Sequence, residues 1–376
     1  MHIHYVSGSR ADFGLMERTL KGLAATPGVQ LSVVVTGQHL LADYGLTVND
    51  IRASGLSIEA KVPVSLSGAD GLEMGRALAT ELLGFLDIWS KGRPDLVMVL
   101  GDRGEMLAAA LAAIHLGIHV AHLHGGELSG TLDESFRHAI SKLAHFHFVA
   151  TEDSAERLRR MGENTDHIWV VGAPGLVGLA DEITADRDGF ALRFGLDLTC
   201  AHRVLVVFHP VVQEAAAAAA QLDSLLDALL DEDCTALVLR PNSDAGGAAI
   251  NARLDATAND ERICVIDHLE RDTYLKALAG ADALVGNSSS GIVESASLGT
   301  PCLNLGSRQN GRLRNVNVVD CSTFTSQAIG AALQQALALR GPFRNFYGDG
   351  RTIDRLAAVL PSLPLHAQVL AKRNSY

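Results

Sequence analysis

Short apolar runs alternate with longer amphipathic stretches along nearly the whole chain. The runs are compact and rich in valine, which is typical of parallel strands that are buried on both faces of a sheet. The expected strands of the first series are residues 2–7, 31–36, 95–102, 119–124, 145–150 and 167–172. Stretches such as 14–26 and 104–116 lie between them and predict crossover helices.

A second series of the same kind follows in the other half of the chain. Its expected strands are residues 203–210, 235–241, 262–267, 282–286 and 301–305. Two β/α series predict two doubly wound α/β domains, with a ligand in the cleft at the carboxyl ends of the strands. We expect domains at 1–172 and 173–350, and a helical segment at 351–376 that packs back on the first domain.

Size and composition agree with this interpretation. A chain of 376 residues exceeds the usual size of one hydrophobic core, and 48% of its residues are hydrophobic. The net charge of −12 argues against nucleic acid or an anionic membrane as a partner. The five cysteines form no C-x-x-C pair, and no apolar run approaches about 18 residues, so we expect free thiols, no membrane span and a cytoplasmic location.

Two polar turns follow expected strands of the first domain. In S-G-S-R-A-D-F-G (7–14), Gly8 permits a tight turn, and Arg10 together with a helix N-terminus could grip a phosphate. In V-L-G-D-R-G-E (99–105), Asp102 stands where a carboxylate points into a cleft. The alternatives are a surface arginine for Arg10 and a helix N-cap for Asp102.

The densest polar segment is H-L-H-G-G-E-L-S-G-T-L-D-E-S-F-R-H (122–138). His122 and His124 alternate at a strand end, and Glu127 and Asp133 follow, which favours an acid/base site. A zinc site of the H-x-H type is an alternative without a convincing further ligand set, so no metal is expected. The structural alternative is Asp133 or Thr131 as a helix cap, with Arg137 paired locally.

The second domain carries the phosphate signal. The segment G-N-S-S-S-G-I-V-E-S (286–295) follows a strand and opens a helix, so Ser288 and Ser289 can donate to a diphosphate and Glu294 can accept ribose hydroxyls. A serine N-cap with a capping-box glutamate is the alternative. His209, in F-H-P after a strand, lies at the cleft edge, and Arg308 could balance the diphosphate charge.

Three other enzyme classes lack their motifs. There is no P-loop, no Tyr followed by Lys four residues later, and no G-x-S-x-G elbow. ATP chemistry, NAD-assisted epimerisation of the short-chain dehydrogenase style and α/β-hydrolase chemistry are therefore not supported. No cofactor is expected.

In chain order the motifs are G-S-R-A-D-F-G, L-G-D-R, H-L-H-G-G-E, G-T-L-D-E-S, F-H-P, R-P-N-S-D-A-G, G-N-S-S-S-G and G-S-R-Q. The order of these motifs along the chain resembles that of the hydrolysing UDP-N-acetylglucosamine 2-epimerases. The similarity is greater to the sialic-acid and legionaminic-acid branch of that family. The resemblance implies a GT-B-like fold, a catalytic first domain, a nucleotide-binding second domain and a homodimer. It also implies cleavage of a UDP-HexNAc to UDP and the free sugar inverted at C2.

Position by position, the resemblance assigns two groups of residues. The implied catalytic positions are Asp102, Asp133, His122, His124, Glu127 and His209. The implied nucleotide contacts are Arg10, Arg103, Gly172, Asn242, Ser288, Ser289, Glu294 and Arg308. His124 departs from the GlcNAc-specific members, which carry a glutamate there, and matches the legionaminic-type branch with its 6-deoxy-2,4-diacetamido substrate. An inverting GT-B glycosyltransferase and a non-catalytic sugar-nucleotide sensor are the rival hypotheses.

Overall fold

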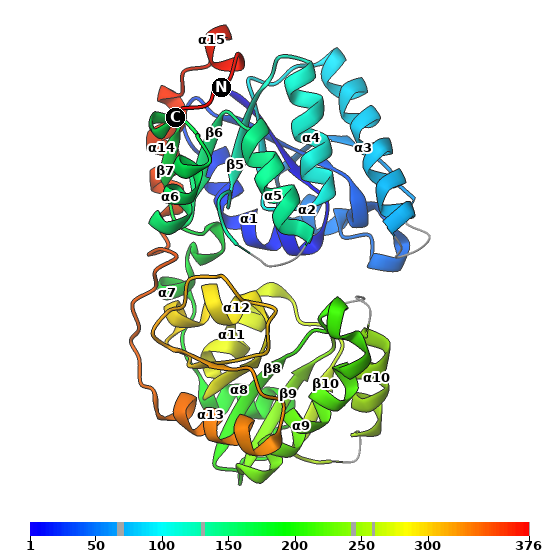
Figure 1. The fold of residues 1–376 in the computed structure, drawn as a ribbon, viewed down its shortest axis with the longest axis vertical. Helices are drawn as coiled ribbons and strands as arrows, with labels where there is room; N and C mark the ends of the chain where they lie inside the picture. The colour runs from blue at the N-terminus through cyan, green and yellow to red at the C-terminus, as the bar shows by residue number, and fades with distance from the viewer. Residues whose placement is uncertain (66–70, 129–131, 242–245, 258–259, 376) are drawn as a thin grey trace. The chain divides into compact units, whose positions relative to one another are not determined.

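The computed structural model describes residues 1–65, 71–128, 132–241, 246–257 and 260–375. The chain divides into two compact units, shown in Figure 1. Unit 1 contains Met1–Val177 and Tyr347–Tyr376, and unit 2 contains Gly178–Phe346. The first boundary between the units lies between Val177 and Gly178, whereas the sequence suggested a boundary between residues 172 and 173. The second lies between Phe346 and Tyr347, whereas the sequence suggested one between residues 350 and 351.

Unit 1 is built on a seven-stranded sheet in the order β3-β2-β1-β4-β5-β6-β7. Every neighbouring pair is parallel. The strands are β1 (His2–Ser7), β2 (Gln30–Val35), β3 (Ser57–Lys61), β4 (Leu96–Leu100), β5 (His119–Leu123), β6 (Phe146–Val149) and β7 (Ile168–Val170). The order reverses beside β1, which places a switch point between β1 and β4 at the carboxyl edge of the sheet.

Helices cover both faces of this sheet. On one face, Met16 and Leu20 of α1 and Leu356 of α14 pack on strand residues such as Tyr5. On the other, Phe85 of α3 packs with residues of α4 and α5 on the opposite sides of the same strands. The helices of unit 1 are α1 (Arg10–Ala24), α2 (Val48–Ala53), α3 (Gly71–Lys91), α4 (Gly104–His115), α5 (Leu132–Leu143), α6 (Glu152–Arg160), α14 (Thr352–Val359) and α15 (Ala367–Leu370).

Unit 2 repeats the plan with a six-stranded parallel sheet in the order β10-β9-β8-β11-β12-β13. The strands are β8 (His202–Val207), β9 (Cys234–Leu239), β10 (Ile263–Ile266), β11 (Ala283–Gly286), β12 (Cys302–Leu305) and β13 (Val318–Cys321). The helices are α7 (Leu179–Glu182), α8 (Arg187–Phe194), α9 (Ala218–Asp231), α10 (Gly247–Ala256), α11 (Arg271–Gly280), α12 (Ser289–Val293) and α13 (Ser326–Ala338). Helices α9, α10 and α13 share one apolar core with the sheet, and α8 and α11 share the other. Two doubly wound parallel α/β domains are thereby confirmed.

The C-terminal segment belongs to unit 1 although it follows unit 2 in the chain. Leu356, Leu360 and Leu363 are buried in the same core as the first helix and the first strands. The backbone amide of Ala173 donates to the carbonyl of Tyr347 at 2.7 Å, so the returning chain lies against the end of the first segment.

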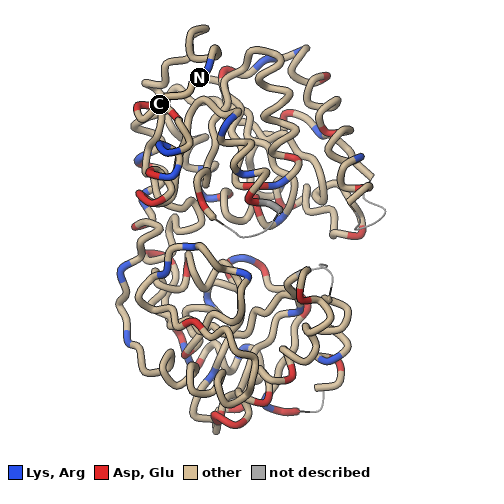
Figure 2. Tube along the Cα trace, in the orientation of Figure 1, with Lys and Arg blue, Asp and Glu red and all other residues tan. Residues whose placement is uncertain are grey.

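Basic and acidic positions are interspersed in both units in Figure 2. Within α6, for example, Arg157 pairs with Asp153 at 2.8 Å and Arg160 pairs with Glu156 at 2.9 Å. No helix in the described part of the chain is both long enough and apolar enough to cross a bilayer.

Candidate active site

The turn after β1 is organised around a buried carboxylate. Ser9 is the N-cap of α1 and forms a capping box with Asp12. The Asp12 carboxylate accepts from the amides of Gly8, at 3.0 Å, and Ser9, at 2.7 Å, and from the hydroxyl of Ser7. The amides of Gly8 and Ser9 are therefore bound within the turn, and the phosphate-binding role of the N-terminus of α1 and Arg10 stays a prediction.

Arg10 lies at the start of α1 with a partly exposed side chain, and its Nε is 3.7 Å from the carboxylate of Asp50. This placement leaves a cationic group at the carboxyl edge of the sheet next to the turn. Burial raises the pKa of Asp12 to about 6, even though the bonds from Ser7, Gly8 and Ser9 oppose the shift.

Two further buried carboxyl groups lie near this turn. A Cβ on Gly8 would come within 2.3 Å of Glu105 Oε1, so the backbone there approaches the Glu105 side chain closely. Glu105 accepts from Arg103 Nε at 2.5 Å. Glu81 accepts from Thr36 Oγ1 at 2.9 Å, and burial, reinforced by the charge of Glu105, raises its pKa to about 8. The site therefore contains carboxyl groups in a weakly solvated setting, beside the cation of Arg103.

Asp102 lies in the turn after β4, and its carboxylate pairs with the guanidinium of Arg137. Arg137 is 3% exposed and comes from α5. The backbone of Arg103 provides the N-cap of α4, so Asp102 does not cap that helix. Arg137 reaches this partner across 35 residues of the chain, and its Nη1 also donates to the carbonyl of Glu127 at 3.2 Å. Arg137 orients Asp102, a role that its sequence position did not reveal.

His122 is fully buried at the end of β5, and both of its ring nitrogens have protein partners. Nε2 is 2.7 Å from the carbonyl oxygen of Gly101, and Nδ1 is 3.1 Å from the hydroxyl of Ser141. Burial lowers the pKa of His122 to about 3, so the ring is neutral. A neutral ring donates from Nε2 to the Gly101 carbonyl and accepts the Ser141 hydroxyl proton at Nδ1. His122 thus links β5, α5 and the turn that carries Asp102.

His124 follows the end of β5 and has a left-handed backbone conformation, with φ +58°. Strand alternation therefore does not set its direction, contrary to the expectation for an H-x-H pair. Its Nδ1 lies 2.7 Å from Oε1 of Glu127, whose side chain is 6% exposed. The two residues form a histidine–carboxylate pair at the carboxyl end of the strand.

Gly172 and Asp133 are the other predicted residues of unit 1. Gly172 lies after β7 with φ +86°, where a Cβ would be 3.4 Å from the carbonyl oxygen of Tyr347, so a glycine suits the crossing of the returning chain. Asp133 lies near the start of α5, and its side chain is outside the described part of the structure. Asn242 lies outside the described residues altogether.

In unit 2, His209 lies two residues beyond β8 and is held by Asn287. The His209 amide donates to Asn287 Oδ1 at 2.8 Å, and Asn287 Nδ2 donates to the His209 carbonyl at 2.7 Å. Burial, and secondly the charge of Arg308, lowers the pKa of His209 to about 3. Arg308 Nη1 donates to the carbonyl of Asn287 at 3.2 Å, which joins the three residues at the carboxyl edge of β8 and β11.

The serine-rich turn after β11 opens α12. Ser288 is its N-cap, with a side chain that accepts from the amide of Ser290, and Ser289 is the first helical residue. Glu294 is 2% exposed, accepts from Ser290 Oγ at 2.5 Å and pairs with the guanidinium of Arg271. The capping-box alternative is wrong, because Glu294 binds Ser290 and Arg271. Arg271 was missed by the sequence analysis, since nothing in its local pattern distinguishes it from a surface arginine at the start of a helix.

One group in the described part of the chain has metal-ligand spacing, namely His2, His4 and Glu59 at the opposite edge of the sheet. Trp89 Nε1 donates to His4 Nδ1 at 3.1 Å, which places the proton of a neutral His4 ring on Nε2. That nitrogen is 3.1 Å from His2 Nε2 and is suited to donate to it. A metal on the same atom would need the proton on Nδ1, facing the Trp89 donor, so these residues do not fit a metal site.

The comparisons with known proteins agree with this arrangement. Residues 21–361 match the family model described as UDP-N-acetylglucosamine 2-epimerase. The chain belongs to this family. It is 47% identical over 378 residues, covering 100% of this chain and 99% of the relative, to the UDP-N,N'-diacetylbacillosamine 2-epimerase (hydrolyzing) of Legionella pneumophila. It is also 32% identical, over 94% of this chain and 93% of the relative, to the UDP-N-acetylglucosamine 2-epimerase of Neisseria meningitidis.

Solved structures of the family have the same fold. The UDP-GlcNAc 2-epimerase from Neisseria meningitidis bound to UDP-GlcNAc superposes with a TM-score of 0.81 at 18% identity, covering 96% of this chain and 100% of that one. The Staphylococcus aureus MnaA–UDP structure superposes with a TM-score of 0.78 at 18% identity, over 100% and 99% of the two chains. The GT-B-like class expected for this epimerase-family enzyme is thus confirmed.

Proposed function

We propose that this enzyme is a hydrolysing 2-epimerase that converts UDP-N,N'-diacetylbacillosamine to UDP and 2,4-diacetamido-2,4,6-trideoxymannose. The identity of 47% to the UDP-N,N'-diacetylbacillosamine 2-epimerase of Legionella pneumophila, over 99% of that relative, supports the proposal. His124 supports it from within the site, because the resemblance places glutamate at this position in GlcNAc-specific members. The observation that carries the proposal is the His124–Glu127 pair at 2.7 Å.

The chemistry requires that the C1–O bond to the diphosphate breaks early. No carbonyl adjacent to C2 acidifies its proton, so oxocarbenium character at C1 must make that proton removable. Arg10, Arg308 and the Ser288–Ser289 turn are the groups we assign to the departing UDP, with Arg103, Gly172, Asn242 and Glu294 as further nucleotide contacts. Preorganised donors of this kind typically contribute several kcal/mol to such a step.

Acid/base groups then remove the C2 proton, giving a 2-acetamidoglycal, and return a proton to the other face while water adds at C1. We assign Asp133 as the base. We assign His124 as an acid/base group and Glu127, whose Oε1 lies 2.7 Å from His124 Nδ1, as the carboxylate that orients it. We assign Asp102, oriented by Arg137, as the second carboxylate, His122 as the buried residue that fixes the Asp102 turn, and His209 as an active-site group of unit 2.

The first test is proton NMR in deuterium oxide with purified enzyme. UDP-N,N'-diacetylbacillosamine and UDP-GlcNAc are incubated separately, and we expect faster release of the free C2-inverted sugar, with deuterium at C2, from the first. Faster turnover of UDP-GlcNAc would reassign the substrate. Transfer to an acceptor without a free epimer would favour a glycosyltransferase, and UDP binding with both nucleotide sugars left intact would favour a sensor.

The pair itself is tested by substitution. We expect His124→Gln and Glu127→Gln each to lower kcat about 100-fold, the typical size of one general acid/base contribution. His124→Glu, which restores a carboxylic acid at this position, is expected to recover part of the loss. Equal kcat for wild type and His124→Gln, with both variants folded, would remove His124 from the mechanism.

The product and its setting follow from the same proposal. A free 2,4-diacetamido mannose sugar suits nonulosonic-acid biosynthesis of the legionaminic type, and nucleotide sugars and five free cysteines suit the cytoplasm. We also propose a homodimer, which size-exclusion chromatography with light scattering would test.

A further inference from the structure

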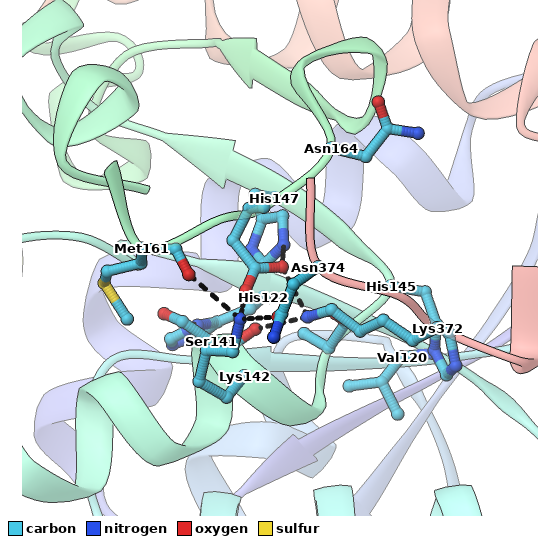
Figure 3. A network of polar contacts seen from close by, with 12 residues as sticks. Val120, His122, Ser141, Lys142, His145, His147, Met161, Asn164, Lys372 and Asn374 are labelled. Atoms are coloured by element: carbon cyan, nitrogen blue, oxygen red, sulfur yellow. Dashed lines mark hydrogen bonds and ion pairs between the residues drawn. The ribbon is translucent and has the colours of Figure 1, made fainter. Parts of the chain in front are cut away.

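Glu163, just beyond α6, is buried and contacts three polar side chains, Lys142, His147 and Lys372, which Figure 3 labels. Its side chain is 0% exposed, and its carboxylate accepts from His147 Nε2 at 2.9 Å and forms ion pairs with Lys142 Nζ, at 2.7 Å, and with Lys372. Burial alone would raise the pKa of Glu163, but the hydrogen bond from His147 and the lysine charges lower it to about 2. Glu163 is therefore ionised at neutral pH and pairs with the lysine ammonium groups.

Lys372 comes from the C-terminal tail, after α15. Besides Glu163, its ammonium donates to the carbonyl of Ser141 at 2.9 Å and to the carbonyl of Ala144 at 2.6 Å. These are carbonyls at the C-terminal end of α5, where a cation is favoured by the helix dipole. The ammonium of Lys372 thus connects the C-terminal tail both to the end of α5 and to the carboxylate of Glu163.

Ser141 continues this chain of contacts towards Asp102. Its hydroxyl is 3.1 Å from His122 Nδ1, and His122 Nε2 is 2.7 Å from the carbonyl of Gly101. Gly101 directly precedes Asp102, whose carboxylate is held from α5 by Arg137. Both contacts to the Asp102 turn therefore depend on the placement of α5, and Lys372 fixes the end of that helix.

We propose that Lys372 is a positioning residue, which sets the orientation of the Asp102 turn through Ser141 and His122. The functional part of this inference rests on the proposed epimerase activity. The structural part does not, because the state of the His122 ring can be measured without substrate. Misplacing a reacting group by about 1 Å can cost about 100-fold in rate, so a distant clamp can affect turnover without touching substrate.

The test compares four variants of the full chain. Lys372→Met removes the ammonium, Lys372→Arg keeps the charge, and Ser141→Ala removes the next link while leaving the tail contacts intact. Arg373→Met is the matched control, because it removes one positive charge from the neighbouring, exposed tail residue. The readouts are kcat, KM and the ring ¹⁵N shifts of His122, assigned by their loss in His122→Asn.

We expect Lys372→Met and Ser141→Ala to lower kcat about 10-fold to 100-fold, with KM within about twofold and shifted His122 signals. Lys372→Arg should recover part of the loss, and Arg373→Met should match wild type. The inference would be overturned if the His122 signals were unchanged in both Lys372→Met and Ser141→Ala. It would also be overturned if the His122 signals shifted in both variants while kcat stayed at the wild-type value. If wild type lacked epimerase activity, the proposed function would fail, and the His122 shifts alone would decide whether Lys372 positions that ring.

Discussion

At the scale of single residues, this enzyme keeps carboxyl groups in weakly solvated surroundings at the carboxyl edge of β1, β2 and β4. Glu81 illustrates the consequence, because it is 4% exposed, it accepts a hydrogen bond from Thr36, and burial raises its pKa to about 8. In the unfolded chain the same group titrates near 4.5. The folded protein therefore keeps a proton that the unfolded chain releases over this interval.

This difference predicts how stability depends on pH. Because the folded pKa of Glu81 is raised, its contribution is fully present below about pH 4.5 and is lost as pH rises through about 8. Between pH 5.5 and 8, the free energy of unfolding of wild type should therefore fall by about 1–3 kcal/mol more than that of Glu81→Gln, whose amide does not titrate. Urea unfolding followed by tryptophan fluorescence measures this, since both tryptophans, Trp89 and Trp169, lie in unit 1. Parallel pH dependences of the two proteins would contradict the assignment of a neutral Glu81.

Residue types and local spacing identified several site residues but not their partners. Asp102 and His124 stand out in the sequence because they follow buried valine-rich strands. Their partners could not be read in the same way, since Arg137 reaches Asp102 across 35 residues and Lys372 reaches Ser141 across 231. Such pairs are fixed by how helices dock, which a single sequence does not encode as a local pattern.

At the scale of elements, the buried strands and the edge strands β7 and β10 were predicted, whereas the edge strands β3 and β13 were not. β3 has an alternating pattern in which no residue is fully buried, and β13 is likewise only partly buried, so neither forms a continuous apolar run. Both lie at sheet edges. The first helix also begins at Arg10, earlier than the amphipathic pattern from residue 14 suggested, because Ser9 and Asp12 form its cap.

Two glycines of α1 predict opposite stability effects. A Cβ on Gly22 would lie 2.5 Å from Ile353 Cδ1 of α14, whereas a Cβ on Gly14 has no atom within 4 Å. Gly14→Ala should stabilise unit 1 by about 0.5–1 kcal/mol, because alanine loses less backbone entropy in a helix. Gly22→Ala should destabilise it by about 1–3 kcal/mol through overpacking against α14. The urea midpoints of the two variants, followed by tryptophan fluorescence, test this prediction. A Gly22→Ala variant more stable than wild type would show that α14 can shift to accommodate the added methyl group without loss of stability.

At the scale of the whole molecule, the two units differ in how the chain builds them. Unit 2 is one continuous stretch, Gly178–Phe346, whereas unit 1 needs both Met1–Val177 and Tyr347–Tyr376. The second stretch supplies Leu356, Leu360 and Leu363 to the core beneath α1. The sequence predicted that this segment is helical and returns to the first domain, from the apolar pattern and from the resemblance, but not which side chains enter the core.

This asymmetry predicts the behaviour of fragments. A fragment of residues 178–346 should show a cooperative thermal transition by circular dichroism, because its two apolar cores are complete. A fragment of residues 1–177 should lack one, and should gain it when a peptide of residues 347–376 is added. Cooperative melting of 1–177 alone would show that the returning segment is dispensable for the fold.

The discontinuity of unit 1 also sets an order of events during synthesis. Most multidomain chains acquire structure from the N-terminus as they leave the ribosome. Here the first strands emerge early but must wait for α14 and for Lys372, which are translated after the whole of unit 2. The nascent second unit can be complete before then, so it is the first of the two units to mature. The stretch translated after it then completes the surroundings of Asp102.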